Sequence, residues 1–431
     1  MLSQLCVFCT AVLLAGVLSQ PLRAEEPHSP KTHEHTECVY NIGSVLTLSD
    51  AIQNALDYSP RIKSAAAEVE AAKGAENQAG YLPNPQIVFE AGNLAGSGEF
   101  GGMDSAEFTY SLTQTVEIGG KRLARMNAAK AAREASGTAL IAERLNIERD
   151  VRIAYFNALA RDEAVKLAVE QEQLAKDVLG TVSKQVQTAE EPEIQLSKAE
   201  VTYTTSIVTR EREEHELKIA KKKLARLLGA FTLDSSLNHA HFFELKAPDP
   251  IENYRVNLAR IPDMRQFSYI KTQKKSLLDL ERARAIPDPG FSLGVRDFKD
   301  SGDQAFVLSV SLPIPVFNRN RGNIARARAE VRQATSDAWQ AGLILEQQLA
   351  ESWEQWRTYY SEAQRLRTEL LPSAEKAFKL ARVGFAEGKF SYHEVLDAQR
   401  TLFGARSQYY DSLRRYHAAR ANVERLGAVT E

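Results

Sequence analysis

Two groups of side chains in this sequence have types and spacing that could do chemistry. The first lies in the polar segment 25–44, where His28, His33, His35 and Cys38 come close together. Imidazole and thiolate are ligands for zinc, copper and similar metals. The spacing matches no standard finger, so a flexible solvated segment is as good an interpretation as weak metal capture.

The second group is an acidic pair, Glu394 and Asp397. Residues three apart on a helix share one face, so the two carboxylates would point the same way. On spacing alone, an ordinary solvated helix face explains them. Phe385 and Phe390 lie nearby and could flank a gate, although core packing explains them better.

Neither group resembles an enzyme site. The other histidines, at positions 215, 239, 241, 393 and 417, lack metal-ligand spacing such as His-Glu-x-x-His, and no serine or cysteine stands in a nucleophile motif. His239 and His241 fall in a linker that we expect to be exposed. The sequence therefore predicts no enzymatic activity and no cofactor.

Composition narrows the class of protein further. Lys and Arg number 54 against 56 Asp and Glu, so no general basic field draws the chain to nucleic acid. Beyond the first two dozen residues, no apolar run reaches the roughly 18 residues of a membrane-spanning helix. Any insertion into lipid must therefore be by strands.

The amino terminus reads as an export signal at 1–24, with an apolar stretch from Leu5 to Leu18 and a cleavable Ala24-Glu25 junction. No Lys or Arg precedes the apolar stretch, which leaves a misassigned start codon or an uncleaved anchor as alternatives. Cys6 and Cys9 stand in no lipobox, so lipidation is not expected. Cys38 would be the single remaining thiol, which excludes an internal disulfide.

The elements that position these residues come in two similar series about 200 residues apart. Each series runs through a helix, a Pro-x-Pro step, a strand, a loop, a second strand, a Gly- or Asn-rich step and long helices ending in Leu-Gly. We expect a first repeat at 45–230, a linker or equatorial segment at 231–250, and a second repeat at 251–428. The chain therefore contains a duplicated unit.

Alternating apolar and small polar residues predict strands near 86–92, 107–114, 291–296 and 305–312. The alternation fits a soluble half-buried hairpin, and it equally fits strands between lipid and water. Four strands cannot close a barrel, and open edges are not tolerated in hydrocarbon. A barrel would thus be shared between chains, and the polar inward faces favour twelve strands from three chains over eight from two.

Between Lys121 and Gln187 there is almost no Pro or Gly, which predicts roughly 65 helical residues, or ~100 Å of helix. Apolar positions recur at coiled-coil intervals in both repeats, for example Leu402, Tyr409, Tyr416 and Val423. The fold class we expect is mainly α with a small β part, with long coiled-coil helices and two β-hairpins.

Three segments carry a family resemblance. They are Leu82-Pro83-Asn84-Pro85, Glu117-Ile118-Gly119-Gly120-Lys121-Arg122 and the run from Leu312 to Gly322. With the duplicated order of elements, they make the chain resemble the TolC-like outer membrane factors of bacterial tripartite efflux systems, and among these the heavy-metal, CzcC-like subgroup.

The resemblance implies a homotrimer with a twelve-stranded barrel in the lipid of the Gram-negative outer membrane and a helical tunnel across the periplasm. It implies two partners, a periplasmic adaptor (membrane fusion protein) and an inner-membrane pump, expected to be of the RND type. The chain itself would be a passive exit duct for heavy-metal cations. The same channel serving drugs or other small molecules, and a soluble periplasmic coiled-coil adaptor or scaffold, are the alternatives.

The resemblance also gives the acidic pair a role. Glu394 and Asp397 match the family segment whose two acidic positions ring the closed pore, with Glu here in place of the first aspartate. In a trimer, six carboxylates would attract cations and resist anions. The corresponding turn of the first repeat contains Pro192, and we expect no pore role for it.

Overall fold

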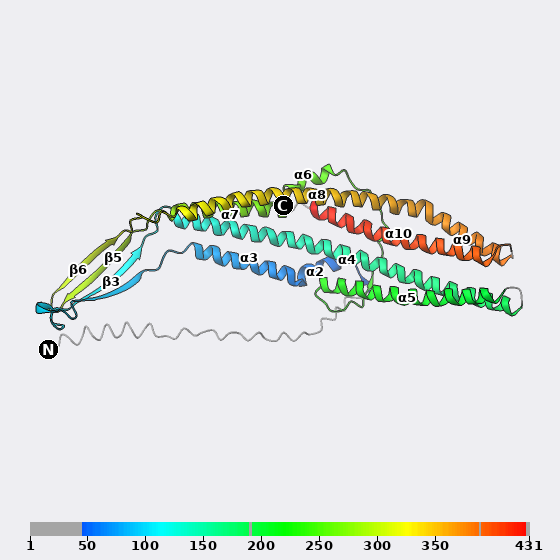
Figure 1. Cartoon of the computed structure of the whole chain (residues 1–431), viewed down its shortest axis with the longest axis horizontal. Helices are drawn as coiled ribbons and strands as arrows, with labels where there is room; N and C mark the ends of the chain where they lie inside the picture. The colour runs from blue at the N-terminus through cyan, green and yellow to red at the C-terminus, as the bar shows by residue number, and fades with distance from the viewer. Residues whose placement is uncertain (1–44, 189–191, 388, 428–431) are drawn as a thin grey trace.

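The chain is a long rod with a small sheet at one end and two helical turns at the other (Figure 1). This computed structural model describes residues 45–188, 192–387 and 389–427. The predicted export signal, the segment 25–44 and its candidate metal ligands His28, His33, His35 and Cys38 lie outside the described residues. Among the described residues, no helix has the length and apolar character to span a membrane.

The sheet contains four antiparallel strands, which lie where the alternating segments predict them. They are β2 (Gln86–Gly92), β3 (Glu107–Thr115), β5 (Gly290–Phe298) and β6 (Gln304–Ser311). Their order is β2-β3-β5-β6, so each repeat supplies one hairpin and the two hairpins join through β3 and β5. Among the described residues, β2 and β6 pair on one side only.

One face of this sheet is apolar and open. The register aligns Ile87 with Leu112, Leu112 with Leu293, and Leu293 with Leu308, which forms an apolar row across all four strands. Leu308 is 75% exposed and Phe306, in the next row, is 88% exposed. The opposite face carries small and polar groups, where Arg296 donates to Thr109 Oγ1 at 3.0 Å. The apolar face therefore lacks cover within this chain.

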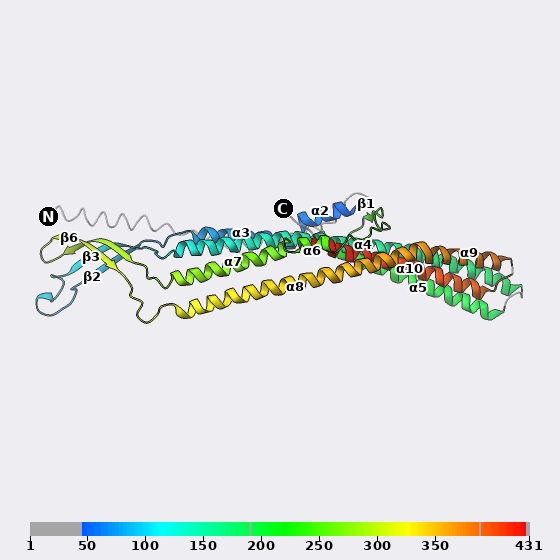
Figure 2. The ribbon, with the colours of Figure 1, turned by 90° about the horizontal axis from the view of Figure 1, so that it is seen from above.

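The helices form the rest of the rod. They are α2 (Leu48–Tyr58), α3 (Pro60–Ala79), α4 (Lys121–Gln187), α5 (Glu193–Leu227), α6 (Glu252–Leu258), α7 (Pro262–Ala283), α8 (Arg321–Arg365), α9 (Leu371–Ala386) and α10 (Tyr392–Gly427). The 67 residues of α4 confirm the predicted long helix. It extends from the sheet to the far turns and packs against α3, α5, α7 and α10 (Figure 2).

The second repeat builds its counterpart of α4 from α8 and α9, joined by the π-helix η2 (Leu366–Leu370). Pro372 follows immediately and has no amide hydrogen to continue the α-helical pattern. A π turn is a known way for a helix to absorb such an interruption. The rod therefore continues through the proline.

Both long helices begin at a left-handed residue. Gly120 before α4 has φ 79° and Asn320 before α8 has φ 57°. Asn320 also donates its amide to Glu281 Oε2 and to the Glu281 carbonyl, both at 2.7 Å. The two repeats thus turn from strand into helix with the same backbone conformation, using glycine once and asparagine once.

The main core lies at mid-length, where the linker crosses α4. A two-residue strand β1 (Val45–Leu46) pairs in parallel with β4 (Ser236–Leu237). The buried hydroxyl of Tyr155 on α4 lies 2.9 Å from the Leu46 carbonyl and accepts from the Asn238 amide at 3.1 Å. This contact fixes the segment at Leu46 and the linker at Asn238 on the same turn of α4.

Candidate functional site

The far end of the rod holds the acidic pair. There the turn between α4 and α5 lies beside the turn between α9 and α10 (Figure 1). Val182, Ala199 and Tyr392 form a small buried cluster that draws on both turns, and Phe385 and Leu396 pack against it. The two hairpin ends are therefore held together by apolar contact.

Glu394 caps the helix that it begins. Its Oε2 accepts from the Ser391 backbone amide at 2.7 Å and lies 3.2 Å from the Ser391 hydroxyl. This carboxylate forms one half of a capping box, the bond from the side chain back to the Ser391 amide, which stabilises the first turn of α10. Ser391 and Glu394 have the Ser-x-x-Glu spacing of this motif, so the sequence carries a signal for the cap.

Asp397 lies on the next turn of α10 and is exposed. It forms no hydrogen bond or ion pair with any residue that the structure describes. Val395 and Gln399 on the same helix are buried, so both acids lie on the side of α10 that faces away from the core of this chain. The carboxylate of Asp397 is thus available to a partner or to an ion.

The two phenylalanines have different surroundings. Phe385 packs against Tyr392 with ring centroids 6.1 Å apart, which fits the core-packing interpretation. Phe390 is 45% exposed, and its ring lies over Gly384, where an added Cβ would overlap it. Phe390 is therefore the one of the two that reaches the surface of the tip.

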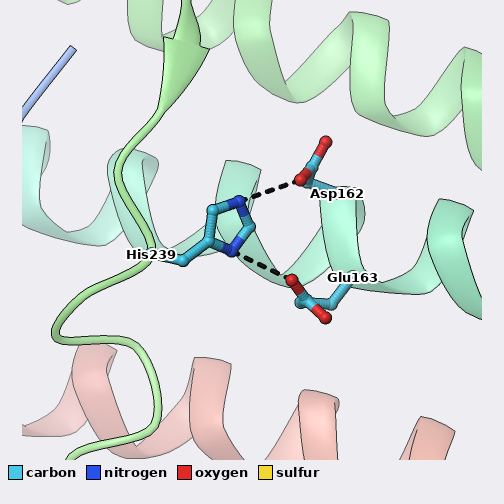
Figure 3. Close-up of side chains that lie close together, drawn as sticks. All are labelled: Asp162, Glu163 and His239. Atoms are coloured by element: carbon cyan, nitrogen blue, oxygen red, sulfur yellow. Dashed lines mark ion pairs between the residues drawn. The ribbon is translucent and has the colours of Figure 1, made fainter. Parts of the chain in front are cut away.

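A second cluster, which sequence reasoning missed, lies at mid-length (Figure 3). The imidazole of His239 stands between two carboxylates of α4. Its Nε2 is 2.9 Å from Asp162 Oδ2 and its Nδ1 is 2.9 Å from Glu163 Oε1. His239 was expected to be exposed, but its side chain is 28% exposed. No spacing signal links these residues, because the fold alone brings the linker onto α4.

Lys166 lies beside these three side chains. Its Nζ lies 3.0 Å from Asp162 Oδ2, 2.8 Å from Glu163 Oε1 and 3.4 Å from His239 Nε2. The ammonium group therefore touches one atom of each of the other three side chains. We refer to Asp162, Glu163 and His239 as the equatorial cluster.

His417 of α10 is buried close to the same level of the rod. Its ring stacks on Phe156 with centroids 3.7 Å apart, and its Nε2 lies 2.9 Å from the Phe242 carbonyl, to which it donates. Burial lowers the pKa of His417 to about 4, although the Phe242 carbonyl opposes the shift. His417 is therefore neutral at physiological pH and serves as a core residue.

Charged groups also hold the junction between sheet and helices. Lys121 is buried, and its Nζ lies 2.6 Å from both Asp288 Oδ1 and the Ile286 carbonyl. Arg125 donates to both oxygens of Glu117, at 2.7 Å and 3.1 Å, which lowers the pKa of that carboxyl. The segment Glu117–Arg122 thus secures the point where the first repeat turns beside the second.

The crystal structure of CusC, a protein that forms a transmembrane channel, has the same fold. The two chains align with a TM-score of 0.74 and 19% identity, over 89% of this chain and 92% of CusC. An apolar open face opposite a face of small and polar groups is the pattern of strands that meet lipid on one side. The model of the outer membrane efflux protein family matches residues 51–230 and 254–428, and the chain belongs to this family.

Relatives match most of its length. The chain is 28% identical to the cobalt-zinc-cadmium resistance protein CzcC of Cupriavidus metallidurans, over 88% of this chain and 90% of that protein. It is 26% identical to the nickel-cobalt-cadmium resistance protein NccC of Alcaligenes xylosoxydans xylosoxydans, over 73% and 74%. It is also 25% identical to the pyoverdine export outer membrane protein OpmQ of Pseudomonas putida, over 84% and 81%.

These findings confirm the family resemblance and the outer membrane location predicted from the sequence. A soluble periplasmic adaptor or scaffold does not account for them, because the family consists of outer membrane efflux proteins. The chain is an outer membrane efflux protein.

Proposed function

We propose that this chain is one subunit of an outer membrane exit duct that exports heavy-metal cations. The observation that carries the proposal is the similarity to CzcC, which covers 90% of that resistance protein. CzcC and NccC are both named for cobalt and cadmium. Co²⁺ and Cd²⁺ are therefore the cations to test first.

A second cargo class has its own support. OpmQ, named for export of the organic ligand pyoverdine, is similar to 84% of this chain. A duct contacts its cargo only in passing, so a common fold is compatible with different cargoes. The identity to OpmQ is lower than that to CzcC, and we therefore favour metal cations.

Deletion of the gene in its native host separates the two cargoes. We expect the deletion strain to lose tolerance to Co²⁺ and Cd²⁺ and a plasmid copy to restore it, while export of siderophores stays unchanged. Unchanged metal tolerance together with loss of siderophore or drug export would overturn the metal assignment.

We propose that the duct is a homotrimer. The open edges of β2 and β6 support this, because unpaired backbone groups in lipid cost several kcal/mol each. Pairing β6 of one chain with β2 of the next removes both edges only when the ring closes, and three chains of four strands would give a twelve-stranded barrel. The open apolar face of the sheet would then meet lipid.

The oligomer can be tested on the protein extracted from outer membranes in mild detergent. We expect native mass spectrometry to give three times the mass of the chain, and heating to release the monomer on a gel. A monomer or dimer under conditions that preserve the helical circular dichroism would contradict the trimer.

Two partners complete the system that we propose, a periplasmic adaptor and an inner-membrane pump of the RND type. Support comes from the tip, where two helical turns held together by the Val182, Ala199 and Tyr392 cluster form the end of the rod away from the sheet. Crosslinking from cysteines placed at this tip should capture the adaptor. Crosslinks confined to outer membrane proteins would argue against this arrangement.

We further propose that Glu394 and Asp397 form an acidic ring at the closed end of the duct. Both are exposed on the side of α10 opposite its buried residues, and Asp397 has no partner among the described residues. Glu394 has a second task as a helix cap, so Asp397 is the cleaner position to test.

In planar bilayers, Asp397→Asn should reduce both cation selectivity and block by multivalent cations. Neutralising Glu394 as well should extend the loss. Glu387→Gln is a matched control, because Glu387 lies at the same tip but is paired with Lys389 at 2.6 Å. Selectivity and block that remain unchanged in the double variant would remove the ring assignment.

A further inference from the structure

The equatorial cluster has the chemistry of a metal site. Two carboxylate oxygens and one imidazole nitrogen lie within 4.8 Å of one another, from Asp162, Glu163 and His239. We propose that they bind a divalent cation of borderline softness, such as Zn²⁺ or Co²⁺, and that the ammonium group of Lys166 competes for the same position. Such a donor set, completed by water, is typical of zinc.

Both sides of the cluster are held in place before any metal binds. Asp162 and Glu163 are consecutive residues in the middle of α4, a helix without interruption from Lys121 to Gln187. His239 follows Asn238, whose backbone amide donates to Tyr155 Oη at 3.1 Å two turns earlier on the same helix. Because both elements are fixed to α4, ligand atoms meet without ordering a loose segment.

The distances are short enough for a shared ion after small side-chain rotations. His239 Nε2 lies 2.9 Å from Asp162 Oδ2. Zinc binds such atoms at about 2.0–2.2 Å in tetrahedral geometry, which separates two ligand atoms by roughly 3.3–3.5 Å. His239 Nε2 and Asp162 Oδ2 therefore need to move apart by only a few tenths of an ångström to admit the ion, whereas Glu163 Oε1, which lies beside Nδ1, must rotate toward it.

The protein does not satisfy the imidazole of His239 by itself. Nδ1 is buried and has no hydrogen-bond partner among the described residues, although Glu163 Oε1 lies 2.9 Å away without the alignment of a hydrogen bond. Nε2 lies 2.9 Å from Asp162 Oδ2 and 3.4 Å from Lys166 Nζ.

Lys166 marks the position that a cation would take. Its Nζ is 3.0 Å from Asp162 Oδ2 and 2.8 Å from Glu163 Oε1, so one positive charge already offsets part of the charge of the two carboxylates. The side chain is 56% exposed and ends in a flexible ammonium group that can swing into water. A divalent cation would replace it and would also engage the imidazole more closely than ammonium does.

A bound cation would tie the linker between the two repeats to α4. This inference is independent of the cargo proposed above, because the equatorial cluster could hold a metal whatever the duct exports. An ammonium clamp that binds no metal is the competing interpretation. The two interpretations make opposite predictions for removal of Lys166.

The test uses the full-length protein in detergent, with His28, His33, His35 and Cys38 replaced by serine to remove the other candidate ligands. Titration with Co²⁺ is followed by visible absorption, which reports bound ligands. We expect saturable binding of one Co²⁺ per chain. His239→Ala should abolish it, and Asp162→Asn should weaken it by about tenfold or more.

Lys166→Met is the variant that distinguishes the metal site from the ammonium clamp. Removal of a competing charge at hydrogen-bond distance should tighten Co²⁺ binding by roughly tenfold. His241→Ala is the matched control, because His241 lies in the same linker beside Glu244 but is 69% exposed and outside the cluster. Oligomeric state on native gels confirms that each variant is folded.

Three outcomes would overturn the proposal. They are absence of Co²⁺ binding in the starting protein, equal binding after His239→Ala, and weaker or unchanged binding after Lys166→Met. Since the Lys166 variant leaves the three ligands intact, its result remains informative even if His239→Ala does not fold. Loss of metal tolerance in the deletion strain is a separate measurement and does not depend on any of these results.

Discussion

Acidification should destabilise this protein through His417. The pKa of its imidazole falls from 6.5 to about 4 on folding, chiefly because the ring is buried between Phe156 and Phe242. Of the charged groups nearby, Arg420 lowers the pKa further and Glu244 raises it. Between pH 6.5 and about 4, His417 therefore binds a proton in the unfolded chain but not in the folded chain.

The direction of the pH effect follows from the linkage between proton binding and folding. The folded state is stable while the ring is neutral in both states, above pH 6.5, and loses stability as pH falls toward 4. The loss should be about 1.4 kcal/mol per chain at pH 5.5 and about 2.6 kcal/mol at pH 4.5. Below pH 4 the folded state also binds the proton, and this contribution reaches its limit of roughly 3.4 kcal/mol.

The assay compares the wild-type chain with His417→Gln, whose amide can still donate to the Phe242 carbonyl but does not titrate. Free energies of unfolding in guanidinium are measured by circular dichroism at pH 7.5, 5.5 and 4.5. Carboxylates titrate in both proteins, so only the difference between them reports His417. His215→Gln, at an exposed position, is the control and should follow the wild type. A difference that does not change between pH 7.5 and 4.5 would refute the reasoning.

Two further predictions concern single contacts. Lys121→Met removes a buried ammonium that lies 2.6 Å from Asp288 Oδ1, and should lower the free energy of unfolding by about 2–3 kcal/mol. Adding Asp288→Asn to this variant should recover part of the loss. No recovery would contradict the pairing. Tyr155→Phe removes the hydroxyl between Leu46 and Asn238, which should lower the free energy of unfolding by about 1–3 kcal/mol. Hydrogen exchange of the Asn238 amide should also become faster. Unchanged exchange at that amide would show that the hydroxyl does not hold the linker.

Local patterns in the sequence predicted the elements well. Alternation located the four strands of the sheet but not the two-residue strands β1 and β4, and the absence of Pro and Gly located α4. Thr47 caps α2 by accepting from the Asp50 amide at 3.2 Å, and its hydroxyl donates to the Asp50 carboxylate at 2.6 Å.

The contacts that depend on distant segments could not be read from the sequence. Pairing of β3 with β5 joins residues about 180 positions apart, and no local signal specifies that register. His239 meets Asp162 and Glu163 because the linker is fixed beside α4 by the small parallel strand pair and Tyr155. A histidine without motif spacing therefore carried no metal signal until the fold supplied its neighbours.

The two open strand edges have a consequence for inheritance. In the ring that we propose, one chain or two chains expose the same pair of edges, and only the third removes them, so assembly is all-or-none. A variant with a defective β6 would still offer a sound β2 to its neighbours and would enter mixed rings. With equal amounts of both chains, only about one ring in eight would contain sound copies alone. Damage to this edge strand should therefore be dominant over a normal copy, whereas loss of the whole chain should be recessive.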